Sequence, residues 1–371
     1  MSGSDPGSDR DPDRDSDSDP NANLEFEFRP FSLELASPLE TSNGTIESRD
    51  GFLVRLADEN GVVGYGEATP LPGWTESRDD CRAALERAQD AFRAGGPNEA
   101  LEAVDRQVAA RHAVSLALAD LQSSRHATPL YRYLGNGPMV GRVPVNATVG
   151  DCSPAETRTA VREASERGYA CCKLKVGLRS VEEDIERVRE ARDAVDDAVE
   201  LRADANEAWT YEDAESALEA FADLGVSLVE QPLPAGALEG HADLRRMDTG
   251  VDIALDEGLL EHGVDAICDA EAADAVVLKP MALGGVDVAR RVAAWVMEVD
   301  IAPIVTTTID GVVARTGAVH LAAAIPDVPA CGLATAELLA EDLGRDPVLL
   351  EKGAAVVPQA KGLGIEGVWE E

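Results

Sequence analysis

The amino-acid sequence predicts an α/β protein, in which a (β/α)8-type barrel follows an α+β capping domain that the C-terminus completes. Short apolar runs alternate with helix-length segments from about residue 141 onwards, which is typical of parallel strands joined by helices. The preceding part shows strand-like alternation and then amphipathic helical segments. An open doubly wound sheet is disfavoured, because no Gly-rich phosphate loop follows the first strand of the repeats.

The chain divides into four predicted segments. Residues 1–23 are rich in Asp, Ser, Gly and Pro and carry no large apolar residue after Met1, so we expect a disordered acidic tail. Residues 24–135 are expected to form the capping domain and residues 136–344 the catalytic barrel. Residues 345–371 have the pattern of loops and a short strand, and we expect them to return to the capping domain.

Within the capping domain, apolar alternation over 24–35 and in two shorter runs predicts a small sheet. Apolar residues at helical spacing, from Cys81 to Phe92, predict that a helical layer follows the sheet. The two shorter strands are expected over 51–57 and 62–66, and the helices over 76–94, 98–109 and 111–124. A Gly- and Pro-rich loop, 66–77, links the sheet to these helices.

The barrel is expected to use eight strands: 143–148, 171–176, 199–205, 226–231, 252–256, 275–279, 302–307 and 332–335. Seven helices are expected between them: 153–168, 180–196, 211–224, 238–247, 259–270, 284–298 and 311–325. A closed barrel of this kind carries its active site at the C-terminal ends of the strands. Polar residues at those ends are therefore the first candidates for a functional site.

The charge and the composition of the chain exclude some classes of binding partner. With 70 acidic and 33 basic residues the chain carries a formal net charge of −37, so we expect neither nucleic acid nor an acidic membrane surface as a partner. The sequence contains no run long enough for a membrane helix and no signal-peptide core, which predicts a soluble, cytoplasmic protein. The six cysteines show no CxxC or zinc-binding spacing and are expected to be reduced. A homo-oligomer is compatible with the sequence, since barrels often assemble.

Lysine is scarce: only five of the 33 basic residues are Lys, beside 70 acidic residues. Such a composition is typical of proteins from halophiles that accumulate salt, because molar salt shortens the Debye length to about 3 Å and makes self-repulsion tolerable. We therefore expect a halophilic source. The scarcity gives weight to Lys173, Lys175 and Lys279, which all lie in or at the end of predicted barrel strands.

Three acidic residues, Asp204, Glu230 and Asp256, follow one another at intervals of 26 residues, about one strand-plus-helix unit. Each lies near the end of a predicted strand, on the face opposite the large aliphatic residues. Converging carboxylates repel one another unless a cation lies among them, and hard oxygen ligands favour Mg²⁺. We expect these three residues to bind Mg²⁺, with Mn²⁺ as a substitute. The alternative is that they are solvated rim acids in a very acidic chain.

Lysines flank the predicted metal site on both sides. Lys173 and Lys175 share one face of the second strand, and Lys279 ends the sixth strand, which lies opposite in an eight-stranded barrel. Ammonium groups near one another and near a divalent cation have depressed pKa values, which lets one of them act as a base near neutral pH. A base and a metal suit removal of the proton α to a carboxylate. Ordinary salt bridging is the alternative, and the lysine scarcity disfavours it.

Together these residues resemble the enolase superfamily, and specifically its muconate-lactonizing subgroup, which has Lys bases on the second and sixth strands of a modified TIM barrel. The matching motifs are KLK (173–175), DAN (204–206), EQP (230–232), DE (256–257) and KP (279–280). The resemblance covers the chain from Leu24 onwards. It implies that Lys175 is the principal acid/base, that Lys173 assists at the substrate carboxylate and that Lys279 is the opposed acid/base or cation. It also implies that the Mg²⁺ ligands are Asp204, Glu230 and Asp256.

Within the subgroup, the loop GEATPLPGWTES (66–77) is most similar to the substrate-covering loop of o-succinylbenzoate synthases. The resemblance implies a carbon–oxygen lyase of menaquinone biosynthesis, which dehydrates 2-succinyl-6-hydroxy-2,4-cyclohexadiene-1-carboxylate through an enediolate. The segment TTTIDG (306–311) resembles a Ser-rich segment of those enzymes but carries Thr for Ser and Asp310 for Glu. The residues expected to contact this small-molecule carboxylate are Pro72, Gly73, Asn206, Thr306 and Thr307.

Three alternatives keep the same barrel. An N-acylamino acid racemase or dipeptide epimerase moves a proton between the two faces of one carbon, and a muconate-type cycloisomerase shares the same catalytic residues. Only the capping loops separate these families from the synthases. A non-catalytic barrel that serves as a binding protein is disfavoured, because it predicts lost rim residues and none is lost.

Overall fold

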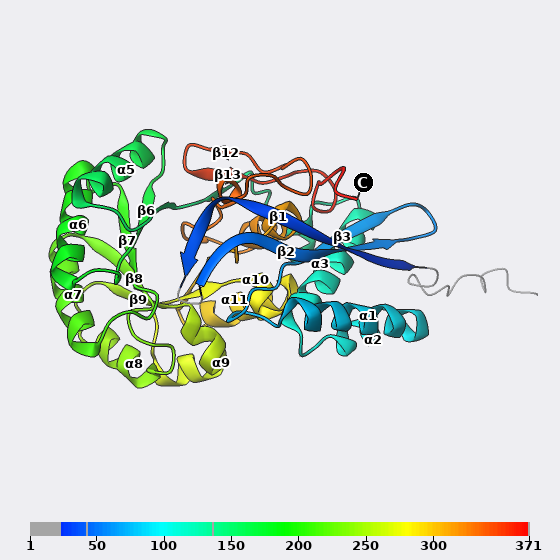
Figure 1. Ribbon diagram of the computed structural model, residues 1–371, viewed down its shortest axis with the longest axis horizontal. Helices are drawn as coiled ribbons and strands as arrows, with labels where there is room; N and C mark the ends of the chain where they lie inside the picture. The colour runs from blue at the N-terminus through cyan, green and yellow to red at the C-terminus, as the bar shows by residue number, and fades with distance from the viewer. Residues whose placement is uncertain (1–23, 42–43, 136, 370–371) are drawn as a thin grey trace, which may run out of the picture.

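The computed structural model describes residues 24–41, 44–135 and 137–369, so the predicted tail, 1–23, lies outside the described residues. A three-stranded antiparallel sheet with its helices precedes a seven-stranded parallel sheet whose strand order follows the sequence. Figure 1 shows these two parts side by side, with the parallel strands curving inside a layer of helices. The structure therefore has the predicted class, a parallel barrel preceded by an α+β unit.

The N-terminal unit packs a small sheet on helices. Its strands are β1 (Glu25–Thr41), β2 (Gly44–Ala57) and β3 (Val63–Ala68), and its helices are α1 (Arg78–Gly95), α2 (Pro97–Ala103), α3 (Val108–Arg125) and α4 (Leu130–Leu134). Helix α1 begins where the Ser77 side chain accepts a hydrogen bond from the Asp80 backbone N–H. Strand β3 lies so close to α3 that a Cβ on Gly66 would lie 1.8 Å from the Ala113 carbonyl oxygen. Only glycine allows this approach.

The parallel strands and the helices after them alternate as predicted, with one exception. The strands are β5 (Ala147–Val149), β6 (Cys171–Lys175), β7 (Glu200–Asp204), β8 (Val226–Glu230), β9 (Asp252–Leu255), β10 (Ala275–Leu278) and β11 (Ala302–Val305). The helices are α5 (Pro154–Glu166), α6 (Val181–Ala194), α7 (Tyr211–Asp223), α8 (Leu238–Arg246), α9 (Glu257–Ala270), α10 (Pro280–Leu283), α11 (Val286–Met297) and α12 (Val312–Ala323). The exception is the short helix α10, which precedes α11 between β10 and β11. Capping boxes at Ser153, Ser180 and Thr210 start α5, α6 and α7. Within the described ranges, no helix is both long and apolar enough to cross a membrane.

The eighth predicted strand, 332–335, is not formed. At its place Cys331 and Gly332 make two isolated parallel bridges, one to Val145 and one to Thr306. The backbone lies close to Thr306 at this place: a Cβ on Gly332 would lie 2.5 Å from the Thr306 hydroxyl oxygen, and that hydroxyl donates to the Gly332 carbonyl at 2.8 Å. Two bridges and a side-chain hydrogen bond therefore join the first and last parts of the parallel sheet, where the sequence predicts a full strand.

The C-terminal residues return across both units. Their short elements are η1 (Ala336–Leu338), β12 (Leu350–Glu351) and β13 (Ala354–Val356), and β13 pairs with β4 (Arg142–Pro144). The predicted strand 143–148 is divided between β4 and β5, and between them the chain changes partner: the Val145 N–H donates to the Gly353 carbonyl beside β13, and the Asn146 N–H donates to the Cys331 carbonyl. Beyond β13, Leu363 and Val368 pack in the same buried cluster as Leu33 of β1.

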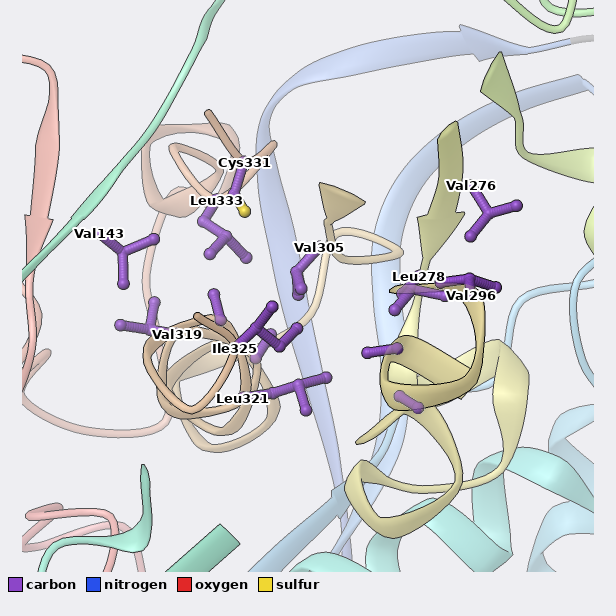
Figure 2. Packing of buried hydrophobic residues seen from close by; sticks show 14 of the residues in the cluster. Val143, Val276, Leu278, Val296, Val305, Val319, Leu321, Ile325, Cys331 and Leu333 are labelled. Atoms are coloured by element: carbon purple, nitrogen blue, oxygen red, sulfur yellow. The ribbon is translucent and has the colours of Figure 1, made fainter. Parts of the chain in front are cut away.

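The main core lies between the parallel strands and the helices outside them. Figure 2 shows part of this cluster, to which β10, β11, α11 and α12 contribute. Its labelled members are Val143, Val276, Leu278, Val296, Val305, Val319, Leu321, Ile325, Cys331 and Leu333. Since Val276 and Leu278 face the helices, the alternate positions of the same strand face the barrel interior.

Candidate active site at the carboxyl ends of the strands

A small apolar cluster fills the barrel interior beneath the candidate site. It consists of Leu228, Ala254, Ala275 and Ile304, one residue from each of β8 to β11. Side chains alternate between the two faces of a strand, so the residues two or four positions further on point into the same interior. These residues are Glu230, Asp256, Lys279 and Thr306. Four of the predicted site residues thus lie above this cluster, at the barrel mouth.

Strands β6 and β7 bring three further predicted residues to the same place. Lys175 is the register partner of Asp204, and Asp204 is the register partner of Glu230. Lys173 lies two residues before Lys175 and on the same face of β6, whereas Leu174 between them packs outward among buried residues of α5 and α6. The two lysines therefore face the carboxylates and not the helices.

Lys173 is bound to two acids at once. Its Nζ lies 2.9 Å from Asp204 Oδ2 and 3.0 and 3.1 Å from the two carboxylate oxygens of Glu230. Burial lowers the pKa of Lys173, but the carboxylates of Asp204 and Glu230 outweigh it and raise the pKa above its ordinary value. Lys173 therefore remains a cation that is held in place.

Lys175 is the more accessible of the two lysines. Its Nζ donates to Asp204 Oδ2 at 2.7 Å and to Asn206 Oδ1 at 2.6 Å. Its side chain is 34% exposed, against 16% for Lys173. Burial works against ionisation of Asp204, but the two lysines outweigh it and hold its pKa below the ordinary range. The geometry gives Lys175 access to the space above the site.

Lys279 completes the other side of the site. Its Nζ lies 2.5 Å from Asp256 Oδ2 and 3.3 Å from the centroid of the Trp74 ring. Trp74 belongs to the 66–77 loop of the N-terminal unit, so both parts of the fold build the site. The predicted substrate contacts in this loop are Pro72 and Gly73 and do not include Trp74, although it is the aromatic residue of a Gly- and Pro-rich loop.

The three carboxylates are almost fully buried, with residue exposures of 1% for Asp204, 4% for Glu230 and 3% for Asp256. Burial, with help from the Asp204 carboxylate, raises the pKa of Glu230 to about 7, and burial raises that of Asp256 to about 6. Among residues 24–41, 44–135 and 137–369, no three His, Cys, Asp or Glu side chains already form a metal-binding group. The Lys173 ammonium contacts two of the three carboxylates.

The residues nevertheless fit a hard divalent cation. Asp256 Oδ1 and Glu257 Oε2 are buried polar atoms with no hydrogen-bond partner, and an unpaired buried carboxylate oxygen is costly. Oxygen ligands from carboxylates are those that Mg²⁺ prefers. The residues that would hold such an ion are Asp204, Glu230 and Asp256, with Glu257 beside them.

Gln231 is a positioning residue that the sequence did not reveal. It follows Glu230 with a left-handed backbone, φ 41°, and its side chain is fully buried. Its Oε1 accepts hydrogen bonds from the backbone N–H groups of Asp256 and Gly258, both at 3.0 Å. Such backbone strain is common beside functional sites. Gln231 thus joins the end of β8 to the peptide that carries Asp256.

The predicted substrate contacts are distributed over the rim. Thr306 and Thr307 follow β11, and their hydroxyl groups bond to the Gly332 carbonyl and the Thr335 hydroxyl respectively. Thr307 is buried, whereas Pro72 and Gly73 are exposed. Asn206 accepts from Lys175 and donates to Glu257 Oε1 at 3.3 Å.

Two known protein families match the chain, one over the N-terminal unit and one over the barrel. Residues 27–135 match the N-terminal domain of the mandelate racemase / muconate lactonizing enzyme family. Residues 156–371 match the enolase C-terminal domain-like family. Together the two matches include every predicted catalytic and metal-binding residue.

Several characterised proteins are similar over most of the chain. An L-Ala-D/L-Glu epimerase from Bacillus subtilis is 27% identical over 93% of this chain and 96% of its own length. A muconate cycloisomerase from Acinetobacter lwoffii is 31% identical over 90% of both chains. An o-succinylbenzoate synthase from Thermobifida fusca is 37% identical, but over 59% of this chain and 68% of its own length.

Solved structures agree with these relatives. The substrate-liganded Bacillus subtilis epimerase superimposes with a TM-score of 0.84 at 27% identity and covers 93% of this chain and 99% of its own. A dipeptide epimerase from Enterococcus faecalis, complexed with Mg and the dipeptide L-Leu-L-Tyr, gives 0.82 at 28% identity and covers 93% and 100%. The chain therefore belongs to the enolase superfamily, with the N-terminal domain of the mandelate racemase / muconate lactonizing enzymes.

Proposed function

We propose that this protein is a Mg²⁺-dependent epimerase that moves the α-proton of a carboxylate substrate, with dipeptides and N-acylated amino acids as its substrate class. The observation that carries the proposal is the placement of the lysines. Lys175 ends β6 and Lys279 follows β10, with three strands between them in the sheet. Each lysine is hydrogen-bonded to a different buried acid. Two acid/base groups on opposite sides of a bound carbon are what an epimerisation requires.

The position of each residue in the site indicates its role in the reaction. When bound, Mg²⁺ supplies the positive charge that makes the proton α to a carboxylate removable. Lys175, the more accessible lysine, takes the proton from one face of the α-carbon, and Lys279 gives a proton to the other face. For the opposite epimer the two lysines exchange roles. Lys173, held between Asp204 and Glu230, keeps its positive charge and stabilises the substrate carboxylate.

The full-length relatives, which are epimerases and muconate cycloisomerases, support these activities over the synthase activity that loop 66–77 predicts. The Bacillus subtilis epimerase aligns over 93% of this chain, which includes the capping unit, and the Enterococcus faecalis enzyme is complexed with Mg and a dipeptide. The o-succinylbenzoate synthase aligns over 59% of this chain. Because the rim residues are common to these enzymes, similarity of the capping unit carries more weight in the choice among them.

The synthase remains the second candidate because of one contact. Lys279 is held by Asp256 on one side and by the Trp74 ring on the other. A lysine fixed in this way suits a stationary cation, which attracts negative charge through space. A dehydration needs one mobile base, Lys175, and one such cation. The two candidates therefore differ in whether Lys279 transfers a proton.

The test is a substrate panel with Mg²⁺ in molar KCl. L-Ala-L-Glu, other dipeptides and N-succinylamino acids are followed in ²H₂O by loss of the α-proton NMR signal, and the cyclohexadiene substrate and muconate by ultraviolet absorbance. We expect α-proton exchange and formation of the second epimer with at least one dipeptide or N-acylated amino acid. Dehydration of the cyclohexadiene without any exchange would overturn the first candidate in favour of the synthase. Turnover of muconate alone would overturn both.

A further inference from the structure

Glu67, the fifth residue of β3, forms a buried link between the N-terminal unit and the barrel. Its carboxylate accepts hydrogen bonds from the backbone N–H groups of Gly311 at 2.6 Å and Ala314 at 2.9 Å. These two N–H groups belong to the start of α12. The Thr69 hydroxyl also donates to it, at 2.5 Å. The side chain is fully buried, so water does not compete for these bonds.

Arg49 of β2 makes a second link beside the first. Its guanidinium donates to the carbonyl oxygens of Thr69 at 2.7 Å and Pro70 at 3.3 Å on one side. On the other side its Nε donates to the Ile309 carbonyl at 3.1 Å. Arg49 is only 3% exposed. One planar side chain thus bonds to the capping loop and to the segment after β11 at the same time.

The segment after β11 is shaped to receive these two side chains. Ile309 has a left-handed backbone, φ 62°, which a β-branched residue adopts only where its surroundings hold it. At Gly311 an added Cβ would lie 3.0 and 3.1 Å from the Glu67 carboxylate oxygens, so a side chain there would press on the link. The backbone of residues 309–311 is therefore matched both to Arg49 and to Glu67.

Both linked segments lead directly to the candidate active site. On one side, the loop that continues from Thr69 and Pro70 carries Trp74, whose ring lies on the Lys279 ammonium. On the other side, Thr306 and Thr307 precede Ile309 at the end of β11. Arg49 and Glu67 therefore connect the segment that carries Trp74 to the segment that carries Thr306 and Thr307.

We propose that Arg49 and Glu67 are positioning residues that fix the 69–75 loop relative to the 306–311 segment and thereby determine which substrate side chains are accepted. This inference deepens the proposed function and rests on it for the substrate class. Neither residue contacts Lys173, Lys175 or Lys279 in the hydrogen-bond and ion-pair network of the described residues. Their effect is therefore on the fit of the substrate and not on the transfer of the proton.

The test compares Glu67→Gln with a matched control, Asp120→Asn. The Asp120 carboxylate is also buried and also accepts two backbone N–H groups, from Tyr65 at 2.8 Å and Leu363 at 2.7 Å. Among the described residues, its carboxylate has no hydrogen bond or ion pair with the 69–75 loop or the 306–311 segment. Each variant replaces one carboxylate oxygen, which accepts a hydrogen bond from a backbone N–H, by an NH₂ group that cannot accept it. A general loss of stability should therefore be similar in the two.

Hydrogen exchange and kinetics are measured on the full-length variants. For Glu67→Gln we expect faster amide exchange at 69–76 and at 309–314, and a KM raised about tenfold for the best substrate with kcat little changed, as for loss of a charge-assisted hydrogen bond. Arg49→Lys, which keeps the charge but loses the planar fork, should behave in the same way. Asp120→Asn should leave exchange in both segments and KM unchanged.

Two results would overturn the inference. One is exchange at 69–76 and 309–314 that stays at the wild-type rate in Glu67→Gln. The other is a KM that rises equally in Glu67→Gln and Asp120→Asn. Because the exchange measurement needs no substrate, it tests the link even if the wild-type protein epimerises nothing, and the substrate panel alone then counts against the proposed function.

Discussion

The Lys279 ammonium nitrogen lies 3.3 Å from the centroid of the Trp74 ring. The lysine follows strand β10 of the barrel, and the tryptophan belongs to the loop between β3 and α1 of the capping unit. A desolvated ammonium over an indole face is attracted by about 2 kcal/mol. This contact joins the residue that we assign to proton transfer with the loop that we assign to substrate choice, so neither part of the fold is sufficient for the site.

Replacing Trp74 should therefore impair substrate binding before it impairs chemistry. We expect Trp74→Ala to raise KM about tenfold, because the loop loses its attraction to Lys279, and Trp74→Phe to have a smaller effect. The control is Trp295→Ala, which removes an indole that is 46% exposed on α11. Steady-state kinetics on the best substrate checks this. Equal KM values in Trp74→Ala and the wild type would show that the ring does not shape the site.

Metal affinity should depend on Asp256 and not on acidic residues in general. Calorimetric titration of Asp256→Asn with Mg²⁺ is expected to show at least about tenfold weaker binding than the wild type, since Asp256 supplies a buried oxygen without a hydrogen-bond partner. Asp252→Asn is the control, because Asp252 is the exposed first residue of β9, the strand that ends just before Asp256. If both variants bind Mg²⁺ as tightly as the wild type does, the proposed ligand set is wrong.

The free energy of unfolding should depend on pH through Asp120. Burial raises the pKa of Asp120 from 3.8 to about 7, against the two backbone N–H groups that lower it. Between these values the folded state binds more protons than the unfolded state, so the contribution of Asp120 to stability is present at low pH and is lost as the pH rises towards 7. Asp120→Asn lacks this titration.

Urea unfolding of both proteins at several pH values in constant KCl measures this difference. The free energy of unfolding of the wild type minus that of Asp120→Asn should fall as the pH rises from about 4 to about 7 and then level off. A difference that is constant over this window would mean that the Asp120 carboxyl titrates at its ordinary value.

Salt should stabilise the protein. A net charge of −37 repels itself, and raising KCl from about 0.1 M to about 1 M shortens the Debye length from about 10 Å to about 3 Å. We expect the melting temperature to rise over this range. Sucrose at equal osmolality is the control, because it leaves the charges unscreened. A melting temperature that responds to sucrose and KCl alike would contradict the halophilic interpretation of the composition.

Sequence patterns could predict only those features of the site that depend on one strand at a time, namely which residue ends the strand and which face it occupies. Asp204, Glu230 and Asp256 recur at the spacing of one βα unit, and alternation with aliphatic residues reveals the face that each occupies. The relations across the fold were not predictable, because no local pattern marks the partner. Trp74 on Lys279, and Glu67 at the start of α12, each join residues more than 200 positions apart.

The predicted eighth strand was wrong for a different reason. Residues 332–335 have apolar character that suits a strand, but Gly332 lies against Thr306 and only two bridges form. Whether such a segment extends into a strand depends on its neighbours on both sides, which propensity alone does not describe. In the same way, the sequence places Gln231 at the end of the predicted strand 226–231 but does not show that its buried amide accepts a hydrogen bond from the Asp256 peptide.

The most direct test of the account is α-proton exchange in ²H₂O by each pure epimer of the best dipeptide, measured by NMR in Lys175→Ala and Lys279→Ala. Both variants should keep the wild-type fold, and Lys352→Ala, at an exposed lysine, serves as the control. The account predicts that each variant loses exchange with a different epimer by at least about a hundredfold, while Lys352→Ala exchanges both. Undiminished exchange of both epimers in Lys175→Ala would contradict it.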